Sequence, residues 1–180
     1  PLPKPFMVLA TQNPGEFVGT YPLPEAQLDR FMFKVVVPFP TLDELSEIVD
    51  MTVKAQTQHA CAVANAQDIL EMREIARQVP IAPSVQEYAL KLVLATHPEL
   101  DTSPEISRKY LRFGASPRAA QAMLSAARVR ALNQGRYNVA FDDIRYVAYA
   151  TLRHRLALNF EALTAGEKID GIIGSLLNLL

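Results

Sequence analysis

The stretch Phe-Met-Phe-Lys-Val-Val-Val-Pro-Phe-Pro-Thr-Leu-Asp-Glu-Leu, residues 31–45, contains the change of pattern that decides the fold. Its first part, Phe31–Val37, is a short and largely apolar run that Pro38 and Pro40 end. Such a run, bounded by turn residues, is typical of a strand buried on both faces of a parallel sheet. Thr41 and Glu44 then form a capping-box pattern, which predicts a helix directly after the prolines.

A second apolar run, Phe6–Ala10, predicts another buried strand upstream. Between the two runs, Pro24 is expected to open a short helical stretch, Glu25–Arg30. Two strands alone do not form a stable sheet. We therefore expect residues 1–40 to be the C-terminal part of an α/β domain whose other strands precede this chain.

Downstream of Thr41 the apolar residues recur at helical spacing, which predicts an all-α domain over residues 41–180. Helix starts are expected at Asn65, at a Ser84–Glu87 capping box and at Ser116-Pro117, and Gly135 is expected to end the last of these helices. Two further helices are expected over Phe141–Leu152 and Ile169–Leu180, and residues 53–64 are expected to form an irregular connection. The predicted fold class is mixed α/β and mainly α, with a remnant of an α/β core followed by helices.

The composition excludes several classes of protein. The 180 residues are 49% hydrophobic, and 18 basic against 19 acidic side chains leave a net charge of −1. These values exclude intrinsic disorder, and the balanced charge argues against a nucleic-acid partner. Cys61 cannot form an internal disulfide, which suits a reducing cytoplasm. No apolar run approaches the roughly 20 residues that a membrane-spanning helix needs, so no span is expected.

Asn13 is the first candidate for function, because it follows the strand expected at residues 6–10. Ligands in open α/β sheets bind outside the carboxyl ends of strands. A carboxamide there can hold a water or a phosphate oxygen through hydrogen bonds without adding charge. The alternative is an asparagine that simply starts a turn before Pro14.

Two arginines are the other candidates. Burial of Leu28 and Phe31 would turn Asp29 and Arg30 outward, where Arg30 is either a solvated charge or a guanidinium offered to a phosphate on a neighbouring molecule. Arg118 lies in the first turn of a helix, where the macrodipole disfavours a cation. An anion bound at that helix start would remove the conflict, while the alternative is a tolerated surface arginine.

The chain lacks the sequence signature of a complete active site. No Gly-x-x-x-x-Gly-Lys-[Ser/Thr] loop occurs, and neither expected strand ends in an Asp-Glu pair that could hold magnesium. The three histidines share no metal-ligand spacing with one another or with Cys61, so no metal site is expected.

Three stretches resemble the MoxR family of AAA+ ATPases. They are Leu-Ala-Thr-Gln-Asn-Pro at residues 9–14, Gly-Thr-Tyr-Pro-Leu-Pro-Glu-Ala-Gln-Leu-Asp-Arg-Phe at residues 19–31, and Phe-Gly-Ala-Ser-Pro-Arg-Ala at residues 113–119. A long string punctuated by prolines is rarely met by chance. Phe17 and Val18 depart from the polar residues typical of that family's loop.

The resemblance implies roles for the three candidates. Asn13 would be sensor 1, which orients the attacking water, and Arg30 would be the arginine finger that reaches the nucleotide of the adjacent subunit. Arg118 would be sensor 2, acting on its own subunit's nucleotide or on a neighbour's. The family further implies an ATP- and magnesium-dependent ATPase in which residues 1–40 end the ATPase core and residues 41–180 form a helical lid. The magnesium ligands would precede this chain, so the 180 residues alone are expected to be inactive.

The resemblance also implies partners: a ring, expected to be a hexamer, and client proteins that the ring remodels or matures, some with von Willebrand A domains. Two alternatives stay open on the sequence. One is a motor similar to the magnesium-chelatase ATPase subunit, and the other is a helical interaction module without enzymatic activity.

Overall fold

The computed structural model describes residues 2–12, 23–53 and 60–180, and within them the chain is mainly helical, as expected. Two short strands, β1 (Leu111–Phe113) and β2 (Ala157–Leu158), pair antiparallel. The helices are α1 (Glu25–Leu28), α2 (Leu42–Val53), α3 (Ala66–Gln78), α4 (Pro83–Ala95), α5 (Glu105–Tyr110), α6 (Pro117–Asn133), α7 (Phe141–Leu152), α8 (Phe160–Thr164) and α9 (Ile169–Leu179).

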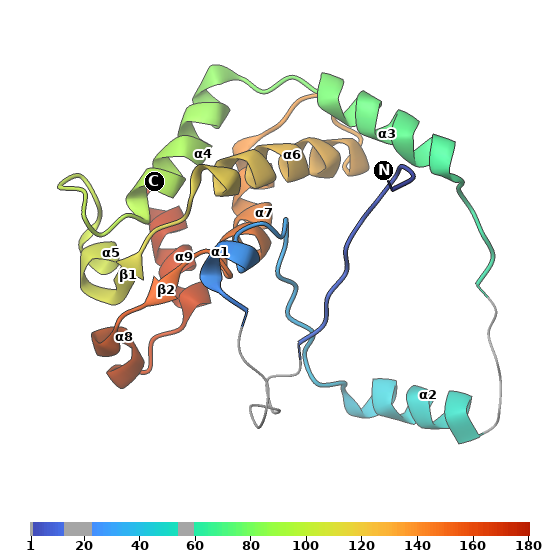
Figure 1. Cartoon of the computed structure of the whole chain (residues 1–180), viewed down its shortest axis with the longest axis horizontal. Helices are drawn as coiled ribbons and strands as arrows, with labels where there is room; N and C mark the ends of the chain where they lie inside the picture. The colour runs from blue at the N-terminus through green and yellow to red at the C-terminus, as the bar shows by residue number, and fades with distance from the viewer. Residues whose placement is uncertain (1, 13–22, 54–59) are drawn as a thin grey trace.

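The core lies where α6 packs against α7, with α4 and α9 completing the helical body (Figure 1). Each of these helices carries apolar residues three or four positions apart, so one face of each helix is apolar and turns inward. The large side chains that are fully buried there are Leu92, Met123, Ile144, Leu152, Ile172, Ile173 and Leu176.

Three of the expected helix starts are confirmed by the hydrogen bonds of their capping residues, among them Ser116 at the start of α6. The backbone N–H of Thr41 donates to Oε2 of Glu44 over 2.7 Å, and this capping box precedes α2. The side-chain oxygen of Asn65 accepts from the backbone N–H of Gln67 and of Asp68 at the start of α3. Both boxes satisfy backbone donors that a helix start leaves without an intrahelical partner.

The expected Ser84–Glu87 capping box is wrong, because α4 begins two residues earlier than that pattern requires. Pro83 occupies the first turn of α4, and Ala82 stands in the capping position without a side-chain hydrogen bond. Proline presets the helical φ and lacks an N–H that would need capping, so the helix starts at Pro83 and Ser84 already lies inside it.

Gly135 ends α6 as expected, and its backbone φ of +68° is the reason a glycine is needed there. Its N–H donates to the carbonyl of Leu132 over 2.8 Å, and the N–H of Arg136 donates to the carbonyl of Ala131 over 2.9 Å. The next helix, α7, has the bounds that its spacing predicts, and α9 ends one residue before the expected Leu180.

The two expected strands are not formed in the described residues. Residues 6–10 and 33–37 have no regular secondary structure, Phe31 and Met32 form a bend, and most of the apolar side chains of both segments are exposed. A strand needs a neighbouring strand to bond with, and no described segment lies alongside Phe6–Ala10 in a ladder. The β1–β2 pair, α5 and α8 were not expected, because elements this short carry no readable period.

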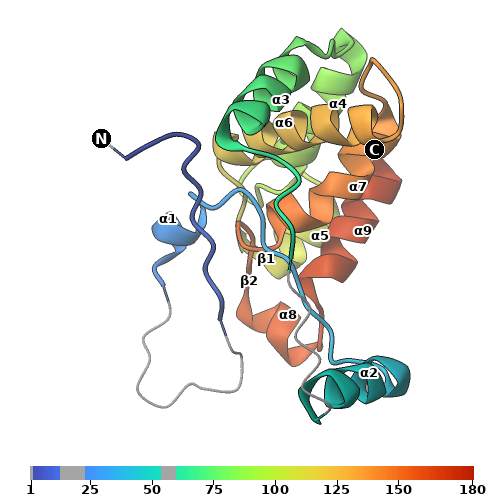
Figure 2. The same ribbon diagram turned by 90° about the vertical axis from the view of Figure 1, so that its right-hand side faces the viewer.

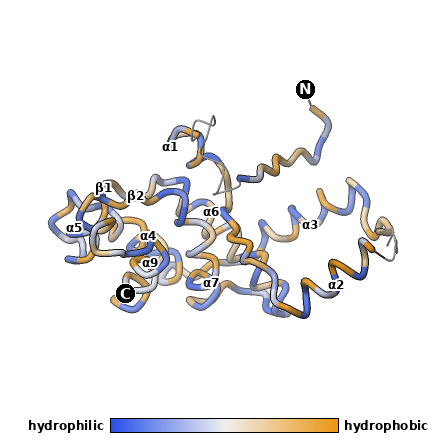
Figure 3. Tube along the Cα trace, turned by 90° about the horizontal axis from the view of Figure 1, so that it is seen from below, coloured by the Kyte–Doolittle hydropathy of each residue, from blue (hydrophilic) through white to orange (hydrophobic). Residues whose placement is uncertain are grey.

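The first helix after the prolines, α2, lies apart from the helical body (Figures 1 and 2). No residue of α2 or α3 is buried, and Ile69, Met72 and Ile75 of α3 are largely exposed. Figure 3 shows hydrophobic stretches along the N-terminal segment and along α2. Among the helices of the described part, none has the length and apolar character that crossing a membrane requires.

Asp143 holds the connection between α6 and α7 from inside the core. Its carboxylate is fully buried and accepts from Nη1 and Nη2 of Arg136 over 2.8 and 2.5 Å and from the N–H of Ala140 over 2.8 Å. Arg130 completes the ion pair, with its Nε 3.2 Å from Oδ1. Burial alone would raise the pKa of Asp143, but these donors and charges outweigh it and hold the pKa below its usual range.

We expect Asp143→Asn to lower the free energy of unfolding by about 1–3 kcal/mol near pH 7, because it removes the buried charge that the donors of Arg136 and Ala140 and the ion pair with Arg130 stabilise. The depressed pKa means that the carboxylate stabilises the fold above the unfolded-state value of about 3.9, and this contribution is lost as pH falls through the folded-state pKa. The difference between wild type and variant should therefore shrink in acid. Urea unfolding from pH 7 to pH 2.5 measures it, with the exposed Asp101→Asn as control. A difference that stays constant over this range would contradict the assignment.

Candidate functional site

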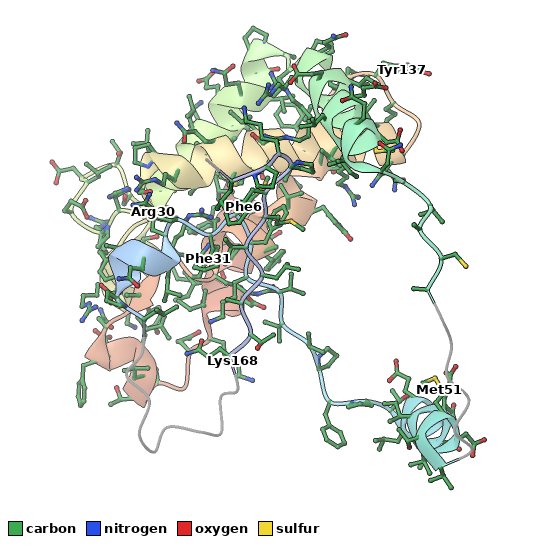
Figure 4. All side chains as sticks on the ribbon, turned by 45° about the vertical axis from the view of Figure 1, so that its right-hand side comes forward. Phe6, Arg30, Phe31, Met51, Tyr137 and Lys168 are labelled. Carbon is green, nitrogen blue, oxygen red and sulfur yellow. The ribbon has the colours of Figure 1, made fainter. Side chains whose placement is uncertain are left out.

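Arg30 follows Asp29, the residue that caps the C-terminal end of α1, and its side chain is exposed to solvent. Its backbone N–H donates to the carbonyl of Gln27 over 3.2 Å, so the residue is fixed by the turn that ends α1. Among the described residues, none forms a hydrogen bond or an ion pair with its guanidinium. Figure 4 locates Arg30 and Phe31 at the end of α1, beside the helical body. The prediction that the side chain of Arg30 is exposed is confirmed.

Asp29, which the sequence also placed outside, instead faces the helical body. Its side chain is 16% exposed, and its carboxylate accepts from the hydroxyl of Ser116 over 2.8 and 2.9 Å. Nη1 of Arg118 donates to it over 3.0 Å, and Nε of Arg155 donates over 3.1 Å. One carboxylate thus joins the end of α1 to the start of α6 and to the segment that follows α7.

These donors set the ionisation of Asp29. Burial alone would raise the pKa of this carboxyl, but the hydrogen bonds from Ser116, Arg118 and Arg155 outweigh burial and hold the pKa below its usual value. Asp29 is therefore an anion under physiological conditions and keeps both arginines engaged.

Arg118 lies in the first turn of α6, as the sequence predicts, and Ser116 caps the helix through a 3.2 Å bond from the N–H of Arg118. The sequence also suggested that an anion at this helix start would offset the unfavourable position of the cation. The structure brings such an anion from within the chain, since Asp29 bonds both Ser116 and Arg118. The guanidinium of Arg118 remains more than half exposed.

A second set of contacts holds the residues that follow Arg30. The carbonyl of Phe31 accepts from Nε2 of His154 over 2.9 Å, and the N–H of Lys34 donates to the carbonyl of Ala150 over 2.8 Å. Nη1 of Arg153 donates to the carbonyl of Lys34 over 3.3 Å. Burial, supported by the charges of Arg155 and Lys34, lowers the pKa of His154 despite its bond to Phe31, so the imidazole is neutral and acts as an N–H donor.

The loop before α6 is seated by a close contact at Gly114. A Cβ on Gly114 would lie 2.7 Å from the carbonyl oxygen of Thr96 and 2.8 Å from the ring of His97. The next residue, Ala115, is fully buried, with its N–H bonded to the hydroxyl of Thr96 over 2.9 Å and its carbonyl 3.0 Å from Nε2 of His97. Because Gly114 has no side chain, the loop can pack closely against Thr96 and His97, and this packing positions the backbone that leads to Ser116 and Arg118.

The structure brings two of the three predicted site residues, Arg30 and Arg118, to one corner through Asp29. The third, Asn13, lies outside the described residues. Within residues 2–12, 23–53 and 60–180 there is no group of three or more histidine, cysteine, aspartate or glutamate residues that could hold a metal ion.

Asp29 and Arg155 are the residues that sequence reasoning missed. Arg153-His154-Arg155 reads as a basic cluster that suits the end of a helix, and this reading needs no ligand for any of the three. The signal in the sequence was the position of Arg155 between two apolar residues, Leu152 and Leu156. Both leucines are buried in the structure, and a charged side chain at such a place requires partners.

Two family models match the chain. One is described as ATPase family associated with various cellular activities (AAA) and matches residues 1–33, and the other is described as AAA lid domain and matches residues 104–173. "Chaperone MoxR1" of Mycobacterium tuberculosis is 39% identical over 163 residues, which cover 91% of this chain and 43% of the relative. The chain belongs to the MoxR-like AAA+ proteins.

Other relatives agree with this family. YeaC of Bacillus subtilis is 35% identical over 180 residues, covering 98% of this chain and 53% of YeaC, and Protein MoxR of Paracoccus denitrificans is 26% identical over 163 residues. A solved structure from Cytophaga hutchinsonii, described as a candidate ATPase, has a TM-score of 0.92 and 37% identity, covering 100% of this chain and 55% of its own. The MoxR-like chain thus spans about half the length of the relatives it matches.

We expect Gly114→Ala to destabilise the fold by about 1–3 kcal/mol, because the added methyl group overlaps the backbone carbonyl of Thr96 and the ring of His97, two residues whose side chains bond Ala115. Chemical denaturation measures the change. Gly171→Ala is the matched control, since a Cβ there meets nothing within 4 Å and the residue lies in a helix. Equal stability of Gly114→Ala and wild type would contradict the contact.

Proposed function

We propose that this MoxR-like chain supplies the arginine-bearing part of an ATPase that works as a ring, with Arg30 as the arginine finger. The observation that carries the proposal is the contrast between Arg30 and its neighbours. The backbone around Arg30 is held by the helical body, while its own guanidinium is exposed and has no partner among the described residues. A fixed backbone with a free planar cation suits the recognition of a phosphate on another molecule.

The chemistry expected of such a finger is electrostatic. Phosphoryl transfer needs little covalent help and depends on positioning and on neutralising the charge spread over the transferred phosphate, for which a guanidinium is suited. Because Arg30 is exposed and its guanidinium has no partner among the described residues, it would be available to act on the nucleotide of an adjacent subunit. ATP hydrolysis would then require that the subunits assemble into the ring.

The other two candidates are proposed to act on the same nucleotide chemistry. For Arg118, the supporting observation is that the carboxylate of Asp29 lies beside it at the start of α6. A phosphate bound there would accept hydrogen bonds from Ser116 and Arg118, which now donate to Asp29. That phosphate would belong either to the same subunit or to a neighbour. For Asn13, the proposed role as sensor 1 rests on the resemblance of residues 9–14.

The cofactors proposed for the whole protein are ATP and magnesium. The arginines of this chain fit the phosphate groups of ATP, and magnesium would neutralise charge on the same phosphates when bound. Its ligands are proposed to come from a part of the protein that precedes Pro1, and the described residues supply no cluster for them.

For the whole protein we propose a division at Thr41, with residues 1–40 ending the ATPase core and residues 41–180 forming the lid. The two family models, at residues 1–33 and 104–173, support that division. We further propose a hexameric ring in the cytoplasm that remodels or matures client proteins, some of them with von Willebrand A domains. The name of the relative "Chaperone MoxR1" supports the chaperone-like role.

Replacing Arg30 by alanine in the whole protein should reduce ATP turnover by about 10³-fold or more while leaving nucleotide binding intact, because the finger acts only on the transition state of a neighbour's nucleotide. Steady-state hydrolysis and the binding of a fluorescent ATP analogue measure the two effects. Arg73→Ala, an exposed arginine of α3, is the matched control and should retain turnover. Turnover that survives in the Arg30→Ala ring would refute the finger role.

The 180-residue chain by itself should show no ATP hydrolysis above background, since the proposed metal ligands and nucleotide-holding loop lie outside it. The same steady-state assay on the purified chain tests this expectation. A rate that Arg30→Ala abolishes in this isolated chain would show that the chain holds a complete site.

A further inference from the structure

Arg155 is a buried arginine whose side chain is 2% exposed. A guanidinium carries five N–H donors, and each one left without an acceptor in such a site would be costly. Its Nε donates to the carboxylate of Asp29, and Nη1 donates to the carbonyls of Met32, over 3.3 Å, and Thr151. Nη2 donates to the carbonyls of Asp29 and Phe31 over 2.9 and 2.6 Å. The number of acceptors equals the number of donors.

The acceptors of Arg155 surround Arg30 in the sequence. The guanidinium binds the carbonyl of the residue before Arg30 and the carbonyls of the two residues after it. Arg30 itself is passed over, so its side chain leaves the clamped backbone towards solvent. Arg155 therefore fixes the direction in which Arg30 projects without touching it.

We propose that Arg155 is the positioning residue for Arg30, a clamp that holds residues 29–32 against the helical body so that the finger is aimed before a phosphate arrives. The inference rests on the proposed finger role of Arg30. An aimed guanidinium loses less conformational freedom on meeting the transition state, and a small displacement of a positioned group costs a large factor in rate.

Lysine cannot replace arginine in this clamp. An ammonium group has three donors on a single nitrogen, so it cannot reach a carboxylate and several carbonyls along a turn at the same time. Arg155→Lys keeps the charge beside Asp29 but removes guanidinium donors from the carbonyls of Asp29 and Met32, and it leaves the carbonyl of Phe31 with His154 alone. The variant thus separates the geometry of the clamp from its charge.

The test compares Arg155→Lys with Arg136→Lys in the whole protein. Arg136, whose side chain is 36% exposed, also binds a buried carboxylate, that of Asp143, at the connection between α6 and α7 and away from Arg30, so both variants weaken an arginine–aspartate cluster. We expect both variants to lose thermal stability. At a temperature where both remain folded, Arg155→Lys should lower kcat by about 10²-fold with KM for ATP changed by no more than about twofold. Arg136→Lys should retain the wild-type kcat.

Hydrogen exchange of the same variants supplies a readout that does not depend on catalysis. Arg155→Lys should increase amide exchange in residues 28–34, including the Lys34 N–H that bonds Ala150, and leave the middle turns of α6 and α7 unchanged. Unchanged exchange in residues 28–34 would overturn the clamp whatever the kinetics show.

The two proposals fail in different ways. If Arg30→Ala abolishes turnover but Arg155→Lys keeps the wild-type kcat, the positioning role is wrong and the finger role stands. If Arg30→Ala retains turnover, the finger role and the positioning role built on it both fall. Equal losses of kcat in Arg155→Lys and Arg136→Lys would also overturn the inference, because a general loss of stability would then explain both.

Discussion

The carboxylate of Asp29 is the contact through which the segment carrying Arg30 is attached to the helical body. It accepts from Ser116, Arg118 and Arg155, which lie 87, 89 and 126 residues away from it in the sequence, and its depressed pKa keeps it charged for all of them. Such a partly buried ion cluster is stable only when every charge has a partner. Each of its members is therefore constrained by the others, and the position of Arg30 follows from that mutual constraint.

Much of the helical body could be predicted from the sequence, because its signals are local. The Asn65 cap, the Gly135 stop and the bounds of α7 depend on residues within a turn or two of each other, and each is confirmed. The Ser84–Glu87 box failed at the same scale, since Pro83 offered a competing helix start two residues earlier. The expected strands failed for the opposite reason: residues 6–10 and 31–37 have strand composition, but a strand exists only with a partner, which no local pattern reveals.

The candidate site was predictable only in part for the same reason. Arg30 and Arg118 could be singled out because they stand at element ends, whereas their meeting through Asp29 is a contact across about ninety residues that periodicity does not encode. Arg155 was harder still. A basic residue after a helix is ordinarily a solvated charge, and only the packed structure shows that this one is buried and that the backbone of residues 29–32 surrounds it.

Sharing of Asp29 between Arg118 and Arg155 has an energetic consequence for the proposed ATPase. A phosphate bound by Arg118 would remove one hydrogen-bond donor from Asp29. Arg155 would then be the one arginine of the pair that still neutralises the Asp29 carboxylate. By linkage, whatever strengthens the hold of Asp29 on Arg118 weakens phosphate binding there, and the converse holds to the same extent. Arg118 and Arg30, the two arginines proposed to bind a nucleotide, are thus coupled through Asp29, which bonds Arg118 and directly precedes Arg30. Phosphate binding at the start of α6 therefore affects how firmly the Arg30 segment is held.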